Sequence, residues 1–174
     1  MIRTGSKRTQ EGIGEGLAER GKDVERLKVE KFKRRARIFF STEGSLDVHF
    51  FLAYEAQTHP GSETVLDVLD SAKTFIPLED ILTNEILLVG KTEIMYVELS
   101  GEDIPQEPQK ALEIPVKVEL LNGEIMEGSF FSDLPPDRLR LSDYLSHTPQ
   151  FILLWGDKID RVLNKTRILS VKHR

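Results

Sequence analysis

The sequence contains no cysteine, which excludes disulfide bonds and metal sites with thiolate ligands. A reducing compartment is the simplest expectation for such a chain. Long apolar runs are also missing, since no stretch approaches the roughly eighteen apolar residues of a membrane span. The first twenty residues lack the apolar core that signal peptides carry. These absences together predict a soluble, cytoplasmic protein.

Motifs for catalysis or cofactor binding are equally scarce. The four histidines, at positions 49, 59, 147 and 173, include no pair with the spacing of metal ligands on a helix or strand. Neither Ser62 nor Ser142 lies in the Gly-x-Ser-x-Gly frame of a nucleophile elbow. The Gly-x-Gly-x-Gly stretch at 12–16 lacks the preceding strand that a phosphate-binding loop requires. We therefore expect no catalytic residues, no cofactor and no bound metal.

An internal repeat is the clearest feature that is present. Phe75–Val97 and Phe151–Val171 share Phe-Ile-x-Leu at the front and Lys-Thr-x-Ile-x-x-Val at the back. The alignment extends upstream to Ile38 and Val118, and its offset changes only where loops differ in length. The chain therefore contains one unit of about 60 residues twice, and this duplication determines the expected architecture.

Each unit consists of short apolar runs separated by polar turns, which is the pattern of a small all-β barrel. In the second unit, Asn122-Gly123 is a strong hairpin signal, and Gly128 marks a bend or a close backbone approach. The sequence predicts a mainly β protein with two tandem, five-stranded small barrels packed together, because a single unit buries little surface alone. The barrels span 36–100 and 114–174, joined by an acidic, proline-containing linker at 101–113.

The N-terminal arm, residues 1–35, differs from the rest of the chain in charge. Residues 1–37 hold 12 Lys and Arg against 6 Asp and Glu, whereas residues 38–174 hold 12 against 23. Glycines disfavour a helix before Lys22, but Asp23 suits an N-cap position and good helix formers follow it. We therefore predict a basic, partly helical arm, with an α-helix over 23–37, in front of an acidic body.

The one dense basic cluster of the chain lies at the end of the arm and just beyond it: Lys28, Lys31, Lys33, Arg34, Arg35 and Arg37. These residues are candidates for binding a polyanion, because each cation that neutralises a phosphate releases counterions. Nucleic acid and an anionic membrane surface are the two candidate targets. Two structural alternatives remain open: the cations complement a helix C-terminus in solvent, or the arm lies on the acidic body.

Two stretches of the second unit follow the order of a known pair of motifs: VELLNGEIMEG at 118–128 and LNKTRILSV at 163–171. They resemble the first and second motifs of Sm-like (SH3-like) small barrels. The resemblance implies a small barrel and, through the family, RNA binding. In this sequence Asn164-Lys165 replaces the Arg-Gly pair of the second motif, so the implied fold carries over better than the implied RNA site.

A second resemblance covers both units. Residues 140–145, 151–154 and 163–171 match in order the pattern of a family of small bacterial domains of uncharacterised function, and the first unit matches it more weakly. This resemblance implies two tandem copies of that domain, and it implies no activity.

Four residues of the second unit are candidates for binding a partner. Tyr144 and Trp155 are aromatic in this unit alone, as partner anchors often are. Burial between the two barrels is the alternative for both. Asn164 and Lys165 are the other candidates, and Lys165 recurs as Lys91 in the first unit. Recurring polar residues are also what turns and helix caps require, so this interpretation stays open.

The sequence favours a non-catalytic interaction or scaffold protein that uses a sheet edge or barrel mouth for a protein partner. The alternative is an Sm-like RNA-binding protein that uses the basic segment 28–37. The net charge of −11 on residues 38–174 opposes the alternative, because an acidic surface repels a polyanion.

Overall fold

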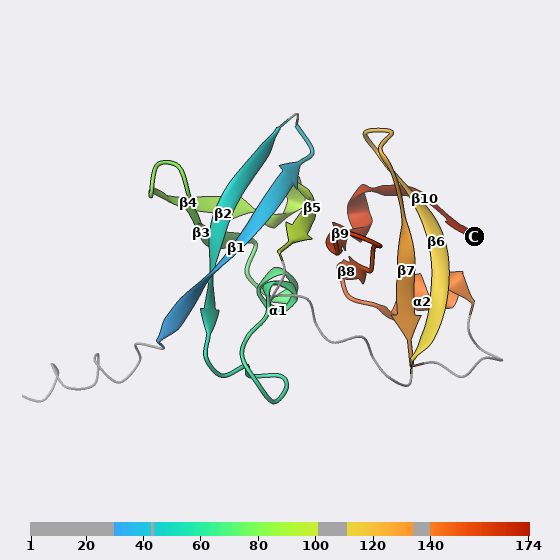
Figure 1. The fold of residues 1–174 in the computed structure, drawn as a ribbon, viewed down its shortest axis with the longest axis horizontal. Coiled ribbons are helices and arrows are strands. Elements are labelled where there is room, and N and C mark those ends of the chain that lie inside the picture. Colours follow the sequence, from blue (N-terminus) through green and yellow to red (C-terminus); the bar gives the residue numbers. More distant parts are fainter. Residues whose placement is uncertain (1–29, 43, 101–110, 134–139) are drawn as a thin grey trace, which may run out of the picture. The chain divides into compact units, whose positions relative to one another are not determined.

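The computed structural model describes residues 30–42, 44–100, 111–133 and 140–174. All of these except Glu30 belong to one unit, Lys31–Arg174. The described chain is mainly β, with ten strands and two short α-helices (Figure 1). None of the helices in these ranges is long and apolar enough to cross a membrane.

The two halves of the chain contain the same elements in the same order. The first repeat comprises β1 (Lys31–Phe40), β2 (Ser45–Ala53), α1 (Val65–Asp70), β3 (Phe75–Asp80), β4 (Ile86–Gly90), the 3-10 helix η2 (Lys91–Glu93) and β5 (Ile94–Leu99). The second comprises β6 (Leu112–Leu120), β7 (Ile125–Ser132), α2 (Leu141–His147), β8 (Phe151–Leu154), β9 (Arg161–Asn164), η5 (Lys165–Arg167) and β10 (Ile168–His173). Each half thus contains five strands, one α-helix and one 3-10 helix in the same order.

The strands form two sheets instead of two closed barrels, which corrects the sequence prediction. The larger sheet has the order β4-β3-β2-β1-β5-β9-β8, and the smaller has the order β10-β6-β7. The reason lies at β5, which pairs with β1 on one edge and with β9 of the second repeat on the other. The β8–β9 hairpin therefore belongs to the sheet of the first repeat, and a single bridge, Ser129 to Trp155, connects it with β7.

The β8–β9 hairpin is also a wall shared by two hydrophobic cores. Successive residues of a strand point to opposite faces, so Phe151 and Val162 contribute to the first core, whereas Ile152 and Leu163 contribute to the second. Most other residues of each core come from one repeat. The two cores therefore share the β8–β9 hairpin between them.

Strand β1 replaces the C-terminal half of the predicted helix. Residues 31–37 pair with β2 along their whole length, and the other part of that prediction, 23–29, lies outside the described residues. Ala36 and Ile38 point into the first core, whereas Arg35 and Arg37 point outward, which is the period of a strand. Lys and Arg favour helices only weakly, and this pairing and burial outweigh that preference. The first repeat accordingly begins at Lys31 rather than at residue 36.

Two predicted glycine positions are confirmed. Gly123 adopts a φ of 85° in the turn between β6 and β7, as the hairpin signal required. Gly128 lies where β7 meets the chain after β8, and a Cβ added to it would lie 2.2 Å from the backbone oxygen of Trp155. The only bridge between β7 and the β8–β9 hairpin in the described residues thus requires a residue without a side chain at position 128.

We expect Gly128→Ala to lower the free energy of unfolding by about 1–3 kcal/mol, because overpacking against a backbone atom forces the strands apart. Gly90→Ala is the matched control, since its Cβ would lie 3.4 Å from the movable ring of Phe75 and its effect should be small. Urea unfolding followed by the fluorescence of Trp155, the single tryptophan, measures both variants. Equal stability of the two variants would refute this account of Gly128.

Candidate functional site

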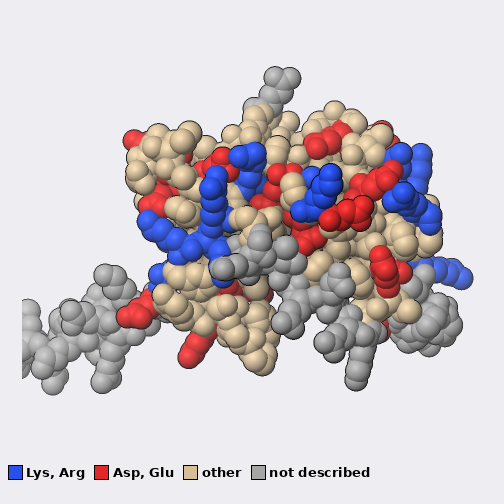
Figure 2. Space-filling view, in the orientation of Figure 1, with Lys and Arg blue, Asp and Glu red and all other residues tan. Residues whose placement is uncertain are grey.

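Part of the predicted polyanion-binding cluster lies along the exposed face of β1: Lys31, Lys33, Arg35 and Arg37. Figure 2 shows Lys and Arg side chains over this part of the molecule with Asp and Glu side chains among them. Arg34 points to the opposite face of β1, where its guanidinium carbon lies 5.2 Å from the centre of the Phe32 ring. Lys28 lies outside the described residues.

Carboxylates on neighbouring strands offset these cations. Arg37 donates two hydrogen bonds to Asp47 on β2 and also pairs in register with Glu98 on β5. The hydrogen bonds from Arg37 hold the pKa of Asp47 below its usual value. The Lys33 Nζ lies 2.6 Å from a carboxylate oxygen of Glu79, and this bond is the main reason for the lowered pKa of Glu79. The positive potential that a polyanion would meet on β1 is therefore reduced.

The recurring lysines bind the ends of the two α-helices. The Lys91 Nζ donates to the carbonyl oxygens of residues 69 and 71 at the end of α1, at 2.8 and 2.5 Å. The Lys165 Nζ donates in the same way to those of residues 145 and 148 after α2, at 2.7 and 2.5 Å. A cation suits this position because the last carbonyl groups of a helix carry partial negative charge. These contacts support the structural interpretation of Lys165.

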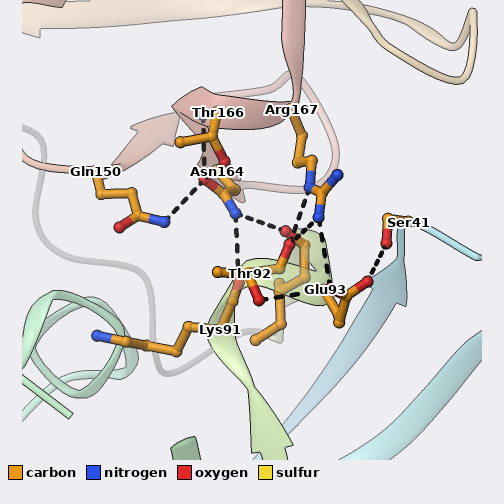
Figure 3. A network of polar contacts seen from close by, with 9 residues as sticks. Ser41, Lys91, Thr92, Glu93, Gln150, Asn164, Thr166 and Arg167 are labelled. Carbon is orange, nitrogen blue, oxygen red and sulfur yellow. Dashed lines mark hydrogen bonds and ion pairs between the residues drawn. The ribbon is translucent and has the colours of Figure 1, made fainter. Parts of the chain in front are cut away.

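Asn164 joins the two repeats from a fully buried position (Figure 3). Its Nδ2 donates to the carbonyl oxygens of Ile94, at 2.8 Å, and Lys91, at 3.4 Å. Its Oδ1 accepts hydrogen bonds from Thr166 and Gln150 of its own repeat. The Asn164 side chain is therefore unavailable to a partner, which corrects its prediction as a partner-binding residue.

Arg167 forms a second polar link between the repeats beside Asn164. Its guanidinium donates two hydrogen bonds to the carbonyl oxygen of Thr92 and lies 3.8 Å from a carboxylate oxygen of Glu93. The Glu93 carboxylate also accepts a hydrogen bond from Ser41 at 2.7 Å (Figure 3). The turn around η2 is thus held by groups from both repeats.

The two candidate aromatic residues differ in burial. Tyr144 is buried and stacks on Phe130, and its burial raises the pKa of its hydroxyl to about 12. Trp155 is half-buried and meets the ring of Phe131 edge-on, with 5.5 Å between the ring centres. Tyr144 therefore has a structural role in the second core, whereas Trp155 stays a candidate for partner contact.

A shallow cleft of about 360 Å³ lies between the tips of the β1–β2 and β6–β7 hairpins. Its wall includes Phe39 and Tyr96, whose rings stack with 4.3 Å between their centres. The Tyr96 hydroxyl donates a hydrogen bond to Glu124 from the other repeat, and burial raises its pKa. The cleft is therefore a consequence of the contact between the repeats.

The β3–β4 hairpin carries an exposed apolar face that the sequence patterns did not indicate. Four side chains form this β3–β4 face: Phe75, Pro77, Ile86 and Leu88. Phe75 and Pro77 are two residues apart on β3 and therefore point to the same face. Leu88 pairs with Pro77 and points to that face too, as does Ile86, two residues before it. Since β4 is the last strand of its sheet, its outer edge has no strand partner among the described residues. The counterparts of Phe75 and Leu88 in the second repeat are apolar as well, so the sequence alone does not distinguish this face from a core.

Comparison of the chain with protein-family models, with curated proteins and with solved structures finds no match. The two family resemblances therefore stay expectations. Within the described ranges, no group of three or more His, Asp or Glu side chains is arranged to hold a metal ion. The β3–β4 face with its free strand edge is the candidate site that the geometry offers.

We expect Asn164→Ala to lower the free energy of unfolding by about 1–3 kcal/mol, because it leaves the buried carbonyl oxygen of Ile94 without its donor. Asn122→Ala is the matched control. It removes one exposed turn bond, to the amide of Glu124, and should cost less than about 1 kcal/mol. Urea titrations of both variants give the comparison. If the two substitutions cost the same, Asn164 does not join the repeats energetically.

Proposed function

We propose that the protein is a non-catalytic interaction protein that binds a β-strand of a protein partner along the outer edge of β4 and the adjoining β3–β4 face. The observation that carries this proposal is the coincidence of exposed apolar side chains with an unpaired strand edge. Phe75, Ile86 and Leu88 are all exposed on this hairpin. An exposed apolar patch of this kind is typical of a binding surface.

The β4 strand lacks the charged residues, prolines and bulges that protect many edge strands. Proteins shield such edges with charged residues, prolines or bulges, because unpaired N–H and C=O groups attract another strand. The sequence of β4, ILLVG, contains no charged residue and no proline, and β4 pairs with β3 without a register shift. A strand added at this edge gains backbone hydrogen bonds and buries the apolar side chains.

The chain itself provides the precedent for this mode of binding. β9 is the counterpart of β4 in the second repeat, and its outer edge is covered by β5 through three residue pairs. Val97 and Val162 meet at the centre of that pairing and are both fully buried. A strand on β4 would repeat an arrangement that this fold already contains.

The RNA-binding alternative receives less support. The cations on β1 lie among Asp47, Glu79 and Glu98, and the last of these also pairs with Arg161 at 3.0 Å. A face with interspersed charges of both signs provides little net attraction for a phosphate backbone. The protein-binding proposal therefore comes first.

A photo-crosslinking amino acid placed at position 88 tests the proposal in cells that produce the full chain. We expect covalent adducts with protein from this position, because the side chain of Leu88 lies on the β3–β4 face. The matched control is position 82, where Leu82 is also exposed but lies in the turn after β3 rather than on a strand.

Adducts from position 88 that exceed those from position 82 support strand binding at β4. Equal yields from both positions, or none from either, would contradict the proposal. Mass spectrometry of the adducts identifies the bound protein and therefore shows whether it is a second copy of this chain or a different protein.

A further inference from the structure

We propose that the strand bound at the β3–β4 face is β10 of a second copy of this chain, so that copies associate head to tail. This inference rests on the proposed function, since it names the partner of the same face. It is carried by a comparison of the two repeats: residues buried at the internal junction have apolar counterparts that are exposed at the two outer ends.

The first outer end is the β3–β4 face. Phe75 is 59% exposed, whereas its counterpart Phe151 is 1% exposed, because Phe151 packs into the first core beside α1. Leu88 is 71% exposed, whereas its counterpart Val162 is 0% exposed in the first core, on a strand that pairs with β5. The registers agree, since Phe75 pairs with Gly90 where Phe151 pairs with Asn164. The same hairpin is thus covered in one repeat and open in the other, with apolar side chains in both.

The second outer end is β10, the counterpart of β5. Met95 of β5 and Leu169 of β10 occupy the same irregularity, because each is skipped in the pairing of its strand. Met95 is 2% exposed in the second core, whereas Leu169 is 59% exposed. β10 is also the last strand of its sheet, with no strand on its other side among the described residues. This end therefore presents an unpaired edge with an exposed apolar side chain, as β4 does.

The helices show the same relation. Val65 and Leu69 of α1 are fully buried, and α1 contacts β8 of the second repeat. Their counterparts Leu141 and Leu145 of α2 are only half-buried. In a second copy placed as the second repeat is placed on the first, α2 and β10 meet the β3–β4 face of the next copy.

The internal junction predicts the register of the new contact. Val97 pairs with Val162 at the centre of the β5–β9 pairing. The counterparts of these two residues are Val171 of β10 and Leu88 of β4, so Val171 of one copy should lie opposite Leu88 of the next. This contact joins two different surfaces, and such an interface extends to a closed ring or an open chain.

Two polar links of the internal junction, those of Asn164 and Arg161, are missing from the new contact. Gly90 stands where Asn164 joins the repeats, and the ion pair between Glu98 and Arg161 has Lys172 and Leu87 as counterparts. The contact between copies is therefore mainly apolar and backbone-mediated. We expect it to be weaker than the internal junction, because these two links are lost.

Sedimentation velocity of the full chain over a range of concentrations tests the inference. The wild-type chain should show species heavier than a monomer, in amounts that rise with concentration. Leu88→Asp blocks β4 and Leu169→Asp blocks β10, so each variant alone should be monomeric. Leu82→Asp is the matched control, because this exposed leucine lies in the turn after β3, and it should associate like the wild type.

Mixing the two blocked variants is the decisive step. The Leu88→Asp chain keeps an intact β10 and the Leu169→Asp chain keeps an intact β3–β4 face, so the mixture should form a one-to-one dimer that grows no further. A wild-type chain that stays monomeric throughout, or blocked variants that do not complement each other, would overturn the inference. If position 88 nevertheless crosslinks to a different protein in cells, the proposed function stands and only the identity of the partner is wrong.

Discussion

The pairing of β5 with β9 is the interaction on which the rest of the structure depends. Three residue pairs join the two repeats there, with Val97 opposite Val162 at the centre. This pairing brings the β8–β9 hairpin into the sheet of the first repeat and makes it a wall of both cores. Each unit of about 60 residues buries little surface by itself, so a separate unit would be marginally stable.

Duplication explains why this junction is asymmetric. The outer edges of β4 and β9 are equivalent in the two repeats. In the second repeat the edge of β9 pairs with β5, whereas in the first repeat the edge of β4 is open among the described residues. Asn164, which is buried at the junction, stands where the open edge has Gly90. Asn164 lies where groups of both repeats satisfy its hydrogen bonds. Gly90 at the equivalent position adds no polar side chain to the open edge.

Much of the fold follows from sequence patterns, and the failures have physical causes. The repeat was predictable from the similarity of two stretches of the sequence. The turn at Asn122-Gly123 and the close approach at Gly128 were predictable because each follows from local backbone requirements. The position of the β8–β9 hairpin in the sheet of the first repeat was not predictable, because strand pairing between distant segments leaves no local signal. Residues 31–37 were misassigned because helix propensity is weak compared with pairing to β2.

The candidate site depended even more on context. Lys165 and Asn164 were predicted as partner-binding residues, but a sequence does not tell a buried junction residue from an exposed binding residue. No local feature distinguishes Phe75 and Leu88 from their counterparts Phe151 and Val162, since all four are apolar. Only the strand order shows that one pair is covered and the other is open.

The central claim is that the β5–β9 junction fuses both repeats into one cooperative unit. Pulsed hydrogen exchange across a urea series, read by mass spectrometry on peptides from β2 and β7, tests it directly beside the fluorescence of Trp155. The account predicts one common midpoint for the first repeat, the second repeat and the tryptophan. Separate midpoints for β2 and β7 would contradict it.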